Sequence, residues 1–157
     1  MQKETSQSQE LQNGAMFFWL LCVYGFVFAM IVIGAITRLT ESGLSMVEWR
    51  PLIGAFPPMS EAEWQRVFDL YKETPEFQKK NFWMEMSDFK TIFFWEWFHR
   101  FWGRVIGIVY AVPLAYFWVR GKIPQGYKPA LLFLLALGAG QAVLGWWMVE
   151  SGLVDRP

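Results

Sequence analysis

Four ionisable residues lie close together in the segment FFWEWFHRFWGR, just before a long uncharged stretch. Glu96, His99 and Arg100 are spaced i, i+3 and i+4, so they share one face of a helix. Imidazole is an axial ligand of heme iron, and arginine pairs with carboxylates through bidentate hydrogen bonds. We therefore predict a heme site with His99 as the iron ligand and with Arg100 and Arg104 at the propionates. Glu96 would lie over the porphyrin edge as an acid, a base or a stabiliser of positive charge.

Two glycines continue the same helical face. Gly103 and Gly107 stand at i+7 and i+11 from Glu96, where a missing side chain would leave room for a flat ligand. We therefore count Gly103 among the predicted cofactor-binding residues. The same GxxxG spacing also occurs where two helices pack closely, and that structural alternative stays open.

The ionisable residues have structural alternatives as well. His99 could hydrogen-bond a neighbouring helix without binding a cofactor. Glu96 could be only the ion-pair partner of Arg100, four residues further on. Arg104 could extend its charge to the lipid headgroups while its stem stays in the membrane. The combination, rather than any single residue, favours a heme.

The helix that carries these residues must lie in a membrane. The chain is 54% hydrophobic and 19% aromatic, and no charged residue occurs between Glu10 and Arg38 or between Lys128 and Glu150. About 20 apolar residues suffice to cross the hydrocarbon of a bilayer. The uncharged residues 105–119 would extend only about 22 Å as a helix. This span must therefore include the turns that carry Glu96 to Arg104, and ionisable residues at such depth usually mark function.

The sequence predicts an all-α, polytopic membrane helix bundle. It divides into a polar cytoplasmic tail (1–15) and a membrane domain (16–157), with spans at 16–37, 89–119 and 129–149 and a long outer loop at 38–88. The turn at 120–128 carries three basic residues and no acidic one, which places it in the cytoplasm and the long loop outside.

The long loop should contain an amphipathic helix. Ser60 and Glu63 are spaced as a capping box, which starts a helix. We expect its apolar face to lie on the membrane surface or against the spans, and a lid over a site is the alternative. That face comprises Trp64, Val67, Phe68 and Tyr71.

The remaining features narrow the class of protein. The tetrapeptide Glu-Ser-Gly-Leu occurs at 41–44 and again at 150–153, which hints at a small repeat. Cys22 is the only cysteine, so neither an internal disulfide nor a cysteine metal cluster can form. The formal net charge is zero, which gives no reason to expect a nucleic acid partner.

The first 14 residues resemble neither a signal peptide nor a transit peptide, so we expect a bacterial inner membrane rather than a mitochondrial one.

Four segments, in order, resemble heme A synthase of the alphaproteobacterial and mitochondrial type. They are GAITRLTESGLSMVEWRP, PPMSEAEWQ, FFWEWFHRFWGRVIG and GQAVLGWWMVESGL, and the resemblance extends from about Phe17 onward. It implies an oxidoreductase that converts the methyl group of heme O to the formyl group of heme A, for cytochrome oxidase assembly. It also implies an eight-helix bundle of two four-helix halves, each with two heme-ligating histidines. The cofactor would be heme B, substrate heme O, or both.

By the same resemblance, His99 corresponds to the first axial histidine of the amino-terminal half and Glu96 to its catalytic glutamate. The chain has a single histidine, so the second ligand would come from the remaining half of the protein or from another chain. Heme O synthase is a possible partner, besides the lipid bilayer. Two rivals stay open: a b-type cytochrome subunit that only transfers electrons, and a heme-free membrane assembly protein.

Overall fold

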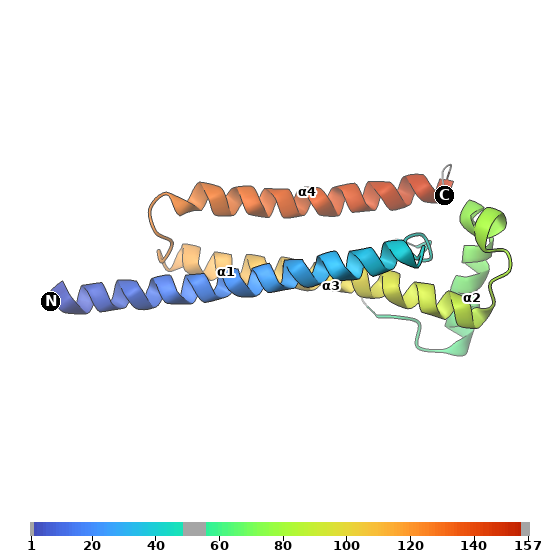
Figure 1. The fold of residues 1–157 in the computed structure, drawn as a ribbon, viewed down its shortest axis with the longest axis horizontal. Coiled ribbons are helices and arrows are strands. Elements are labelled where there is room, and N and C mark those ends of the chain that lie inside the picture. Colours follow the sequence, from blue (N-terminus) through green and yellow to red (C-terminus); the bar gives the residue numbers. More distant parts are fainter. Residues whose placement is uncertain (1, 49–55, 155–157) are drawn as a thin grey trace.

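The computed structural model describes residues 2–48 and 56–154, with side chains from residue 14 to residue 153. These residues form α1 (Gln2–Leu39), α2 (Glu61–Lys72), the π-helical turn η2 (Phe77–Asn81), α3 (Met86–Val119) and α4 (Tyr127–Val154). Helices α1 and α3 lie side by side, α4 runs alongside them, and α2 lies across the end where α1 finishes (Figure 1). We call that end the loop end, and the end with residues 120–126 the turn end.

Three helices are long and apolar enough to cross a membrane, namely Gly14–Leu39 of α1, all of α3, and Tyr127–Leu153 of α4. The described residues contain no strand, so the prediction of an all-α membrane bundle with three spans is confirmed. The helical ends differ from the predicted spans by a few residues. The segment expected as a polar tail is itself helical and continues into α1 without a break. Its Glu, Gln and Lys residues are good helix formers, which explains the continuation.

The turn end is held by a hydrophobic cluster around Trp19. Pro113 lies inside α3, and because proline has no N–H it leaves the carbonyl of Val109 without its usual helical partner. The indole Nε1 of Trp19 donates a hydrogen bond to that carbonyl at 2.9 Å. Tyr110 in turn donates its hydroxyl to the carbonyl of Leu131 in α4, at 2.7 Å. The cluster comprises Met16, Trp19, Tyr110, Leu114, Phe117, Ile123 and Leu131.

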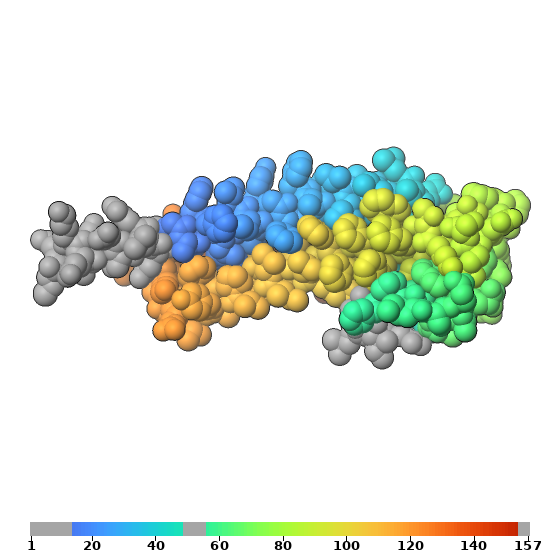
Figure 2. Space-filling model, turned by 90° about the horizontal axis from the view of Figure 1, so that it is seen from below, coloured from blue at the N-terminus to red at the C-terminus, as the bar shows by residue number. Residues whose placement is uncertain are grey.

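The loop end has a second cluster, which we call the aromatic cluster. Ser60 caps α2 by accepting a hydrogen bond from the N–H of Glu63, as the sequence predicted. The apolar face of α2 packs on the first turns of α3, where Phe68 and Tyr71 stack on Phe89 with ring centres 4.8 and 5.2 Å apart. Figure 2 shows α2, in green, lying directly against α3, in yellow-green. The expectation that α2 lies against the spans is confirmed. The buried members are Met46, Phe68, Tyr71, Phe89, Ile92 and Phe93.

Helix α4 packs against the rest of the described chain mainly near its two ends. At the turn end Leu131 is buried, and at the loop end Gly152 packs on Leu44 so closely that an added Cβ would lie 2.8 Å from a Leu44 methyl. The two copies of the Glu-Ser-Gly-Leu tetrapeptide therefore meet in space. Between these points the large apolar side chains of α4 are exposed. Within this chain, the middle of α4 has little protein to pack on.

Candidate functional site

Glu96 lies on α3 within reach of the loop that follows α1, and only 2% of its surface is exposed. Its Oε2 accepts hydrogen bonds from Ser45 Oγ at 2.6 Å and from the backbone N–H of Met46 at 2.8 Å. Its Oε1 accepts a hydrogen bond from Arg100, which also forms an ion pair with it. The ion pair that the i, i+4 spacing suggested is therefore present. Three donors on two oxygens hold this carboxylate in a fixed orientation.

The loop that contacts Glu96 is anchored to the last turn of α1. The N–H of Ser42 donates to the carbonyl of Thr37 at 3.0 Å, and the N–H of Glu41 donates to that of Arg38 at 3.2 Å. This pair of bonds is a Schellman motif, which satisfies carbonyl groups that the helix end would leave unpaired. Glu41 takes the left-handed conformation that the motif requires, with φ of 51°. The end of α1 thus fixes where Ser45 and Met46 meet Glu96.

His99 is half-buried and faces α1. The imidazole lies beside Gly34 of α1, where an added Cβ would make ordinary van der Waals contact with His99 Nε2 at 3.5 Å and Cδ2 at 3.8 Å. One turn further along α3, a Cβ on Gly103 would lie 3.6 Å from the terminal methyl of Met30 in α1. Gly103 therefore also lies where α1 and α3 approach each other. Nothing would lie within 4 Å of a Cβ on Gly107, so that side of α3 is open among the described residues.

The two arginines of the motif differ in their partners. Arg100 binds Glu96 and also approaches the carbonyl of Met46, at 3.4 Å. Arg104 is half-buried, and its Nη1 is buried without a hydrogen-bond partner in the described part of the chain. A buried guanidinium nitrogen without a partner is costly, and a carboxylate of a bound molecule would satisfy it. Arg104 is thus the better placed of the two for a propionate.

These observations fit a heme. A half-buried imidazole lies opposite a glycine, and a guanidinium with an unused donor lies five residues further along the same helix. Imidazole is the usual axial ligand of heme iron, and arginine is suited to its propionates. Among the residues that the structure describes, no group of three or more His, Cys, Asp or Glu side chains could hold a bare metal ion.

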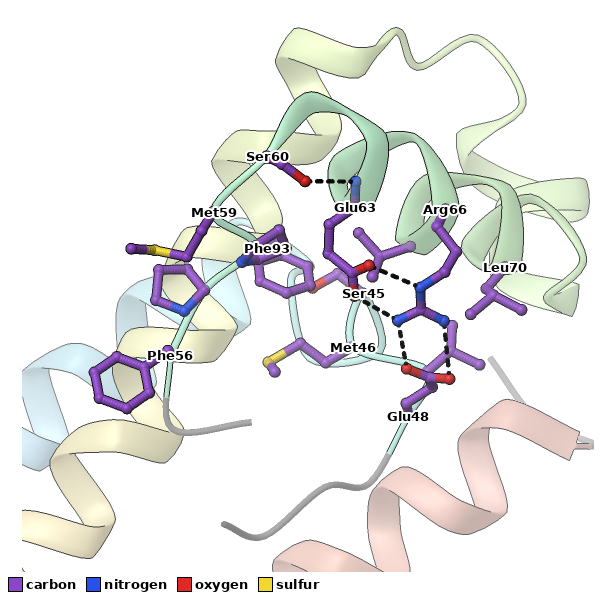
Figure 3. Close-up of a pocket in the computed structure, with 14 residues that line it drawn as sticks. Ser45, Met46, Glu48, Phe56, Met59, Ser60, Glu63, Arg66, Leu70 and Phe93 are labelled. Atoms are coloured by element: carbon purple, nitrogen blue, oxygen red, sulfur yellow. Dashed lines mark hydrogen bonds and ion pairs between the residues drawn. The ribbon is translucent and has the colours of Figure 1, made fainter. Parts of the chain in front are cut away.

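A pocket of about 460 Å³ lies at the loop end, between the loop after α1 and α2 (Figure 3). Arg66 crosses one side of it and donates hydrogen bonds to Glu48 at 3.1 and 2.9 Å and to Glu63 at 3.1 and 2.7 Å. Ser45 and Met46 line this pocket and also bond Glu96. The pocket and the carboxylate therefore share two residues.

A second buried carboxylate lies near the aromatic cluster, in the loop between α2 and α3. Glu76 is buried, and its Oε2 has no hydrogen-bond partner among the described residues. Burial raises the pKa of Glu76 to about 7, and repulsion from Glu96 and Glu41 adds to the rise while Lys80 opposes it. Burial likewise raises the pKa of the Tyr71 hydroxyl to about 12.

The sequence pattern identified the residues of α3 but missed those that face them. Ser45, Met46 and Gly34 all lie within or next to the segment GAITRLTESGLSMVEWRP, which the sequence analysis used only for its resemblance. A polar, serine-rich stretch directly after an apolar span was the available signal. The predicted residues Glu96, His99 and Arg100 do lie together at the interface of α3 with α1 and its loop.

Comparison with known proteins supports the resemblance. Residues 17–157 match the family model described as COX15-CtaA, cytochrome oxidase assembly protein. The chain is 50% identical over 157 residues to the heme A synthase of Novosphingobium aromaticivorans, covering 99% of this chain and 45% of that protein. It is 49% identical over 150 residues to that of Parvibaculum lavamentivorans, covering 96% and 44%. It is 54% identical over 137 residues to that of Roseobacter denitrificans, covering 87% and 36%.

The chain thus spans less than half the length of these relatives, and no solved structure gives a significant match. The match to the family model nevertheless covers nearly the whole chain, including the residues of the site. The chain therefore belongs to the COX15-CtaA family of cytochrome oxidase assembly proteins.

Proposed function

We propose that this chain is the amino-terminal, heme-holding part of a heme A synthase, which oxidises the methyl group of heme O to the formyl group of heme A. The observation that carries the proposal is the buried Glu96 carboxylate, fixed by Ser45, Met46 and Arg100 one helical turn from His99. A carboxylate oriented in this way outside bulk water is arranged for electrostatic catalysis.

Each residue of the site has a role in this proposal. His99 would hold the heme iron and Arg104 a propionate, and the heme would supply the redox chemistry when bound. Glu96 would stabilise the positive charge that develops at the methyl carbon as it is oxidised. Because its three donors are already in place, the carboxylate needs no reorientation during the reaction. Burial of Glu96 keeps competing water away from it.

The chain has one histidine, so a second axial ligand would come from outside residues 1–157, from the remaining half of the protein or from another chain. The exposed middle of α4 leaves apolar surface for such a partner or for lipid. We further propose a multi-pass protein of the bacterial inner membrane, in which the turn at 120–128 faces the cytoplasm. Heme O synthase, which would supply the substrate, is a candidate partner.

The test is heme extraction from cells that make heme O but no heme A. These cells would express either this chain or a chimera in which it replaces the matching segment of the Novosphingobium aromaticivorans enzyme. We expect heme A from the chimera, and no heme A once Glu96 is replaced by alanine. A chimera that makes no heme A, next to an active parent enzyme, would contradict the proposal.

The Glu96–Arg100 ion pair also supports a second candidate, a b-type heme subunit that only transfers electrons. In that case Glu96 would be structural, and its carboxylate would serve to neutralise Arg100, whose side chain is only 11% exposed. The two functions differ in one result. A subunit that only transfers electrons would give a Soret absorbance from bound heme, but a chimera containing it would make no heme A.

A further inference from the structure

Ser45 is the residue outside α3 that lies closest to the Glu96 carboxylate, and it is almost completely buried. Its hydroxyl has two acceptors within reach, Glu96 Oε2 at 2.6 Å and the carbonyl of Ser42 at 3.1 Å. A serine hydroxyl carries one proton and can donate to only one acceptor at a time. The distance of 2.6 Å is typical of a charge-assisted bond to a carboxylate, so the proton belongs to the bond with Glu96.

The backbone around Ser45 is held on the side away from Glu96. The N–H of Ser45 donates to the carbonyl of Ser42 at 3.4 Å, and both the N–H and the hydroxyl of Ser42 donate to the carbonyl of Thr37 in α1. These bonds fix the position of Ser45 relative to the end of α1, and Ser45 in turn orients the Glu96 carboxylate. The same helix carries Gly34, the residue that His99 faces.

We propose that Ser45 is a positioning residue, whose hydroxyl aims the Glu96 carboxylate relative to the heme site. This inference rests on the proposed role of Glu96 in catalysis. Met46 contributes a backbone N–H to the same oxygen, which no side-chain substitution other than proline removes. A substitution of Ser45 can therefore change the orientation of the carboxylate while Glu96 itself is kept.

The carbonyl of Ser42, the second acceptor within reach of the Ser45 hydroxyl, makes the inference testable. When Glu96 is removed, the Ser45 hydroxyl can turn to the carbonyl of Ser42, so it is not left buried and unsatisfied. A Ser45 substitution should then lower the stability of the chain only slightly in a Glu96→Ala background, and lower it clearly when Glu96 is present. Such non-additivity identifies a residue that acts through another.

The experiment uses the chimera described above. In Ser45→Ala we expect an unchanged Soret absorbance, which reports bound heme, and a heme A yield about tenfold lower, because one hydrogen bond to a charged group is lost. Ser45→Cys has a side chain of similar size that is a weaker donor, so its heme A yield should lie between those of Ser45→Ala and the unaltered chimera. Ser60→Ala is the matched control, since it also removes a serine hydroxyl bond at the loop end but one without contact to Glu96. Equal heme A yields from Ser45→Ala and the unaltered chimera would overturn the inference.

A second measurement needs no catalysis. The midpoint of thermal unfolding in detergent is measured for this chain with Ser45→Ala, with Glu96→Ala and with both. We expect Ser45→Ala to lower the midpoint in the unaltered chain and to have little effect beside Glu96→Ala. Additive effects would overturn the inference, because they would show that the two side chains do not interact. If Glu96→Ala leaves heme A formation intact, the proposed catalytic role of Glu96 fails instead.

Discussion

At the loop end Tyr71 and Phe89 are fully buried, whereas in the middle of α4 Phe133 and Trp147 are each 64% exposed. Both regions are rich in aromatic residues, but only the loop end contains enough chain to surround them. There α2, η2 and the start of α3 converge, and the loop after α1 adds Met46. The chain therefore builds its own support for Glu96, whereas it leaves the middle of α4 exposed.

The largest expected effect tests this difference directly. Phe89→Ala should remove a ring from the centre of the aromatic cluster and lower the free energy of unfolding by about 3–5 kcal/mol. Phe133→Ala, on the exposed side of α4, should change it by less than about 0.5 kcal/mol. Thermal unfolding in detergent compares the two. Similar losses for both would contradict the idea that the loop end, unlike the middle of α4, is packed within the chain.

The buried Glu76 should make the loop end sensitive to pH. Its pKa is raised from the usual 4.5 to about 7 in the folded chain, so the folded state binds more protons than the unfolded state between these values. The contribution of Glu76 to stability is then fully present below pH 4.5 and is lost as the pH rises through about 7. Glu76→Gln should flatten that dependence, measured as the unfolding midpoint from pH 5 to pH 8. An unchanged slope in Glu76→Gln would rule out this source of pH dependence.

The turn end offers a smaller effect, which depends on a single proline. Trp19→Phe removes the donor to the Val109 carbonyl and should cost about 1 kcal/mol. In a Pro113→Ala background the restored N–H can serve that carbonyl, so the cost of Trp19→Phe should shrink. Unfolding midpoints of the two single variants and the double variant provide the measurement. An equal cost in both backgrounds would mean that the indole is not compensating for the proline.

The smallest expected effect lies at the end of α1. Glu41 takes a left-handed conformation, in which glycine meets no steric penalty. Glu41→Gly should therefore stabilise the chain by about 0.5–1 kcal/mol. Glu150→Gly, in the helical copy of the same tetrapeptide, is the matched control and should destabilise. A destabilising Glu41→Gly would show that this carboxylate does more than occupy a strained position.

The helices could be predicted from the sequence, but the contacts between residues far apart in the chain could not. Three apolar stretches predicted the spans, and Ser60 with Glu63 predicted the start of α2, because these signals are local. Within α3 the spacing of Glu96 and Arg100 offered their ion pair as an alternative to a role of Arg100 at the propionates, and that pair is also a local one. Local signals were sufficient wherever both partners belong to one element.

The partners from other elements were not predictable in this way. Ser45 lies 51 residues from Glu96, and its contact depends on the path of the loop after α1. Gly34 faces His99 only because α1 is rotated so, and a helix that is apolar on all sides gives no stripe from which to predict its rotation. The bond from Trp19 to Val109 likewise required knowing which helix passes Pro113.

The most direct test of the central claim separates heme binding from heme conversion. The chimera is purified with Glu96→Gln and with His99→Ala, and each variant is assayed for its Soret absorbance and for heme A in the extract. The account predicts that Glu96→Gln keeps the absorbance and makes no heme A, and that His99→Ala loses absorbance from this half. If Glu96→Gln instead makes heme A at the rate of the unaltered chimera, the fixed carboxylate is not catalytic and the account is wrong.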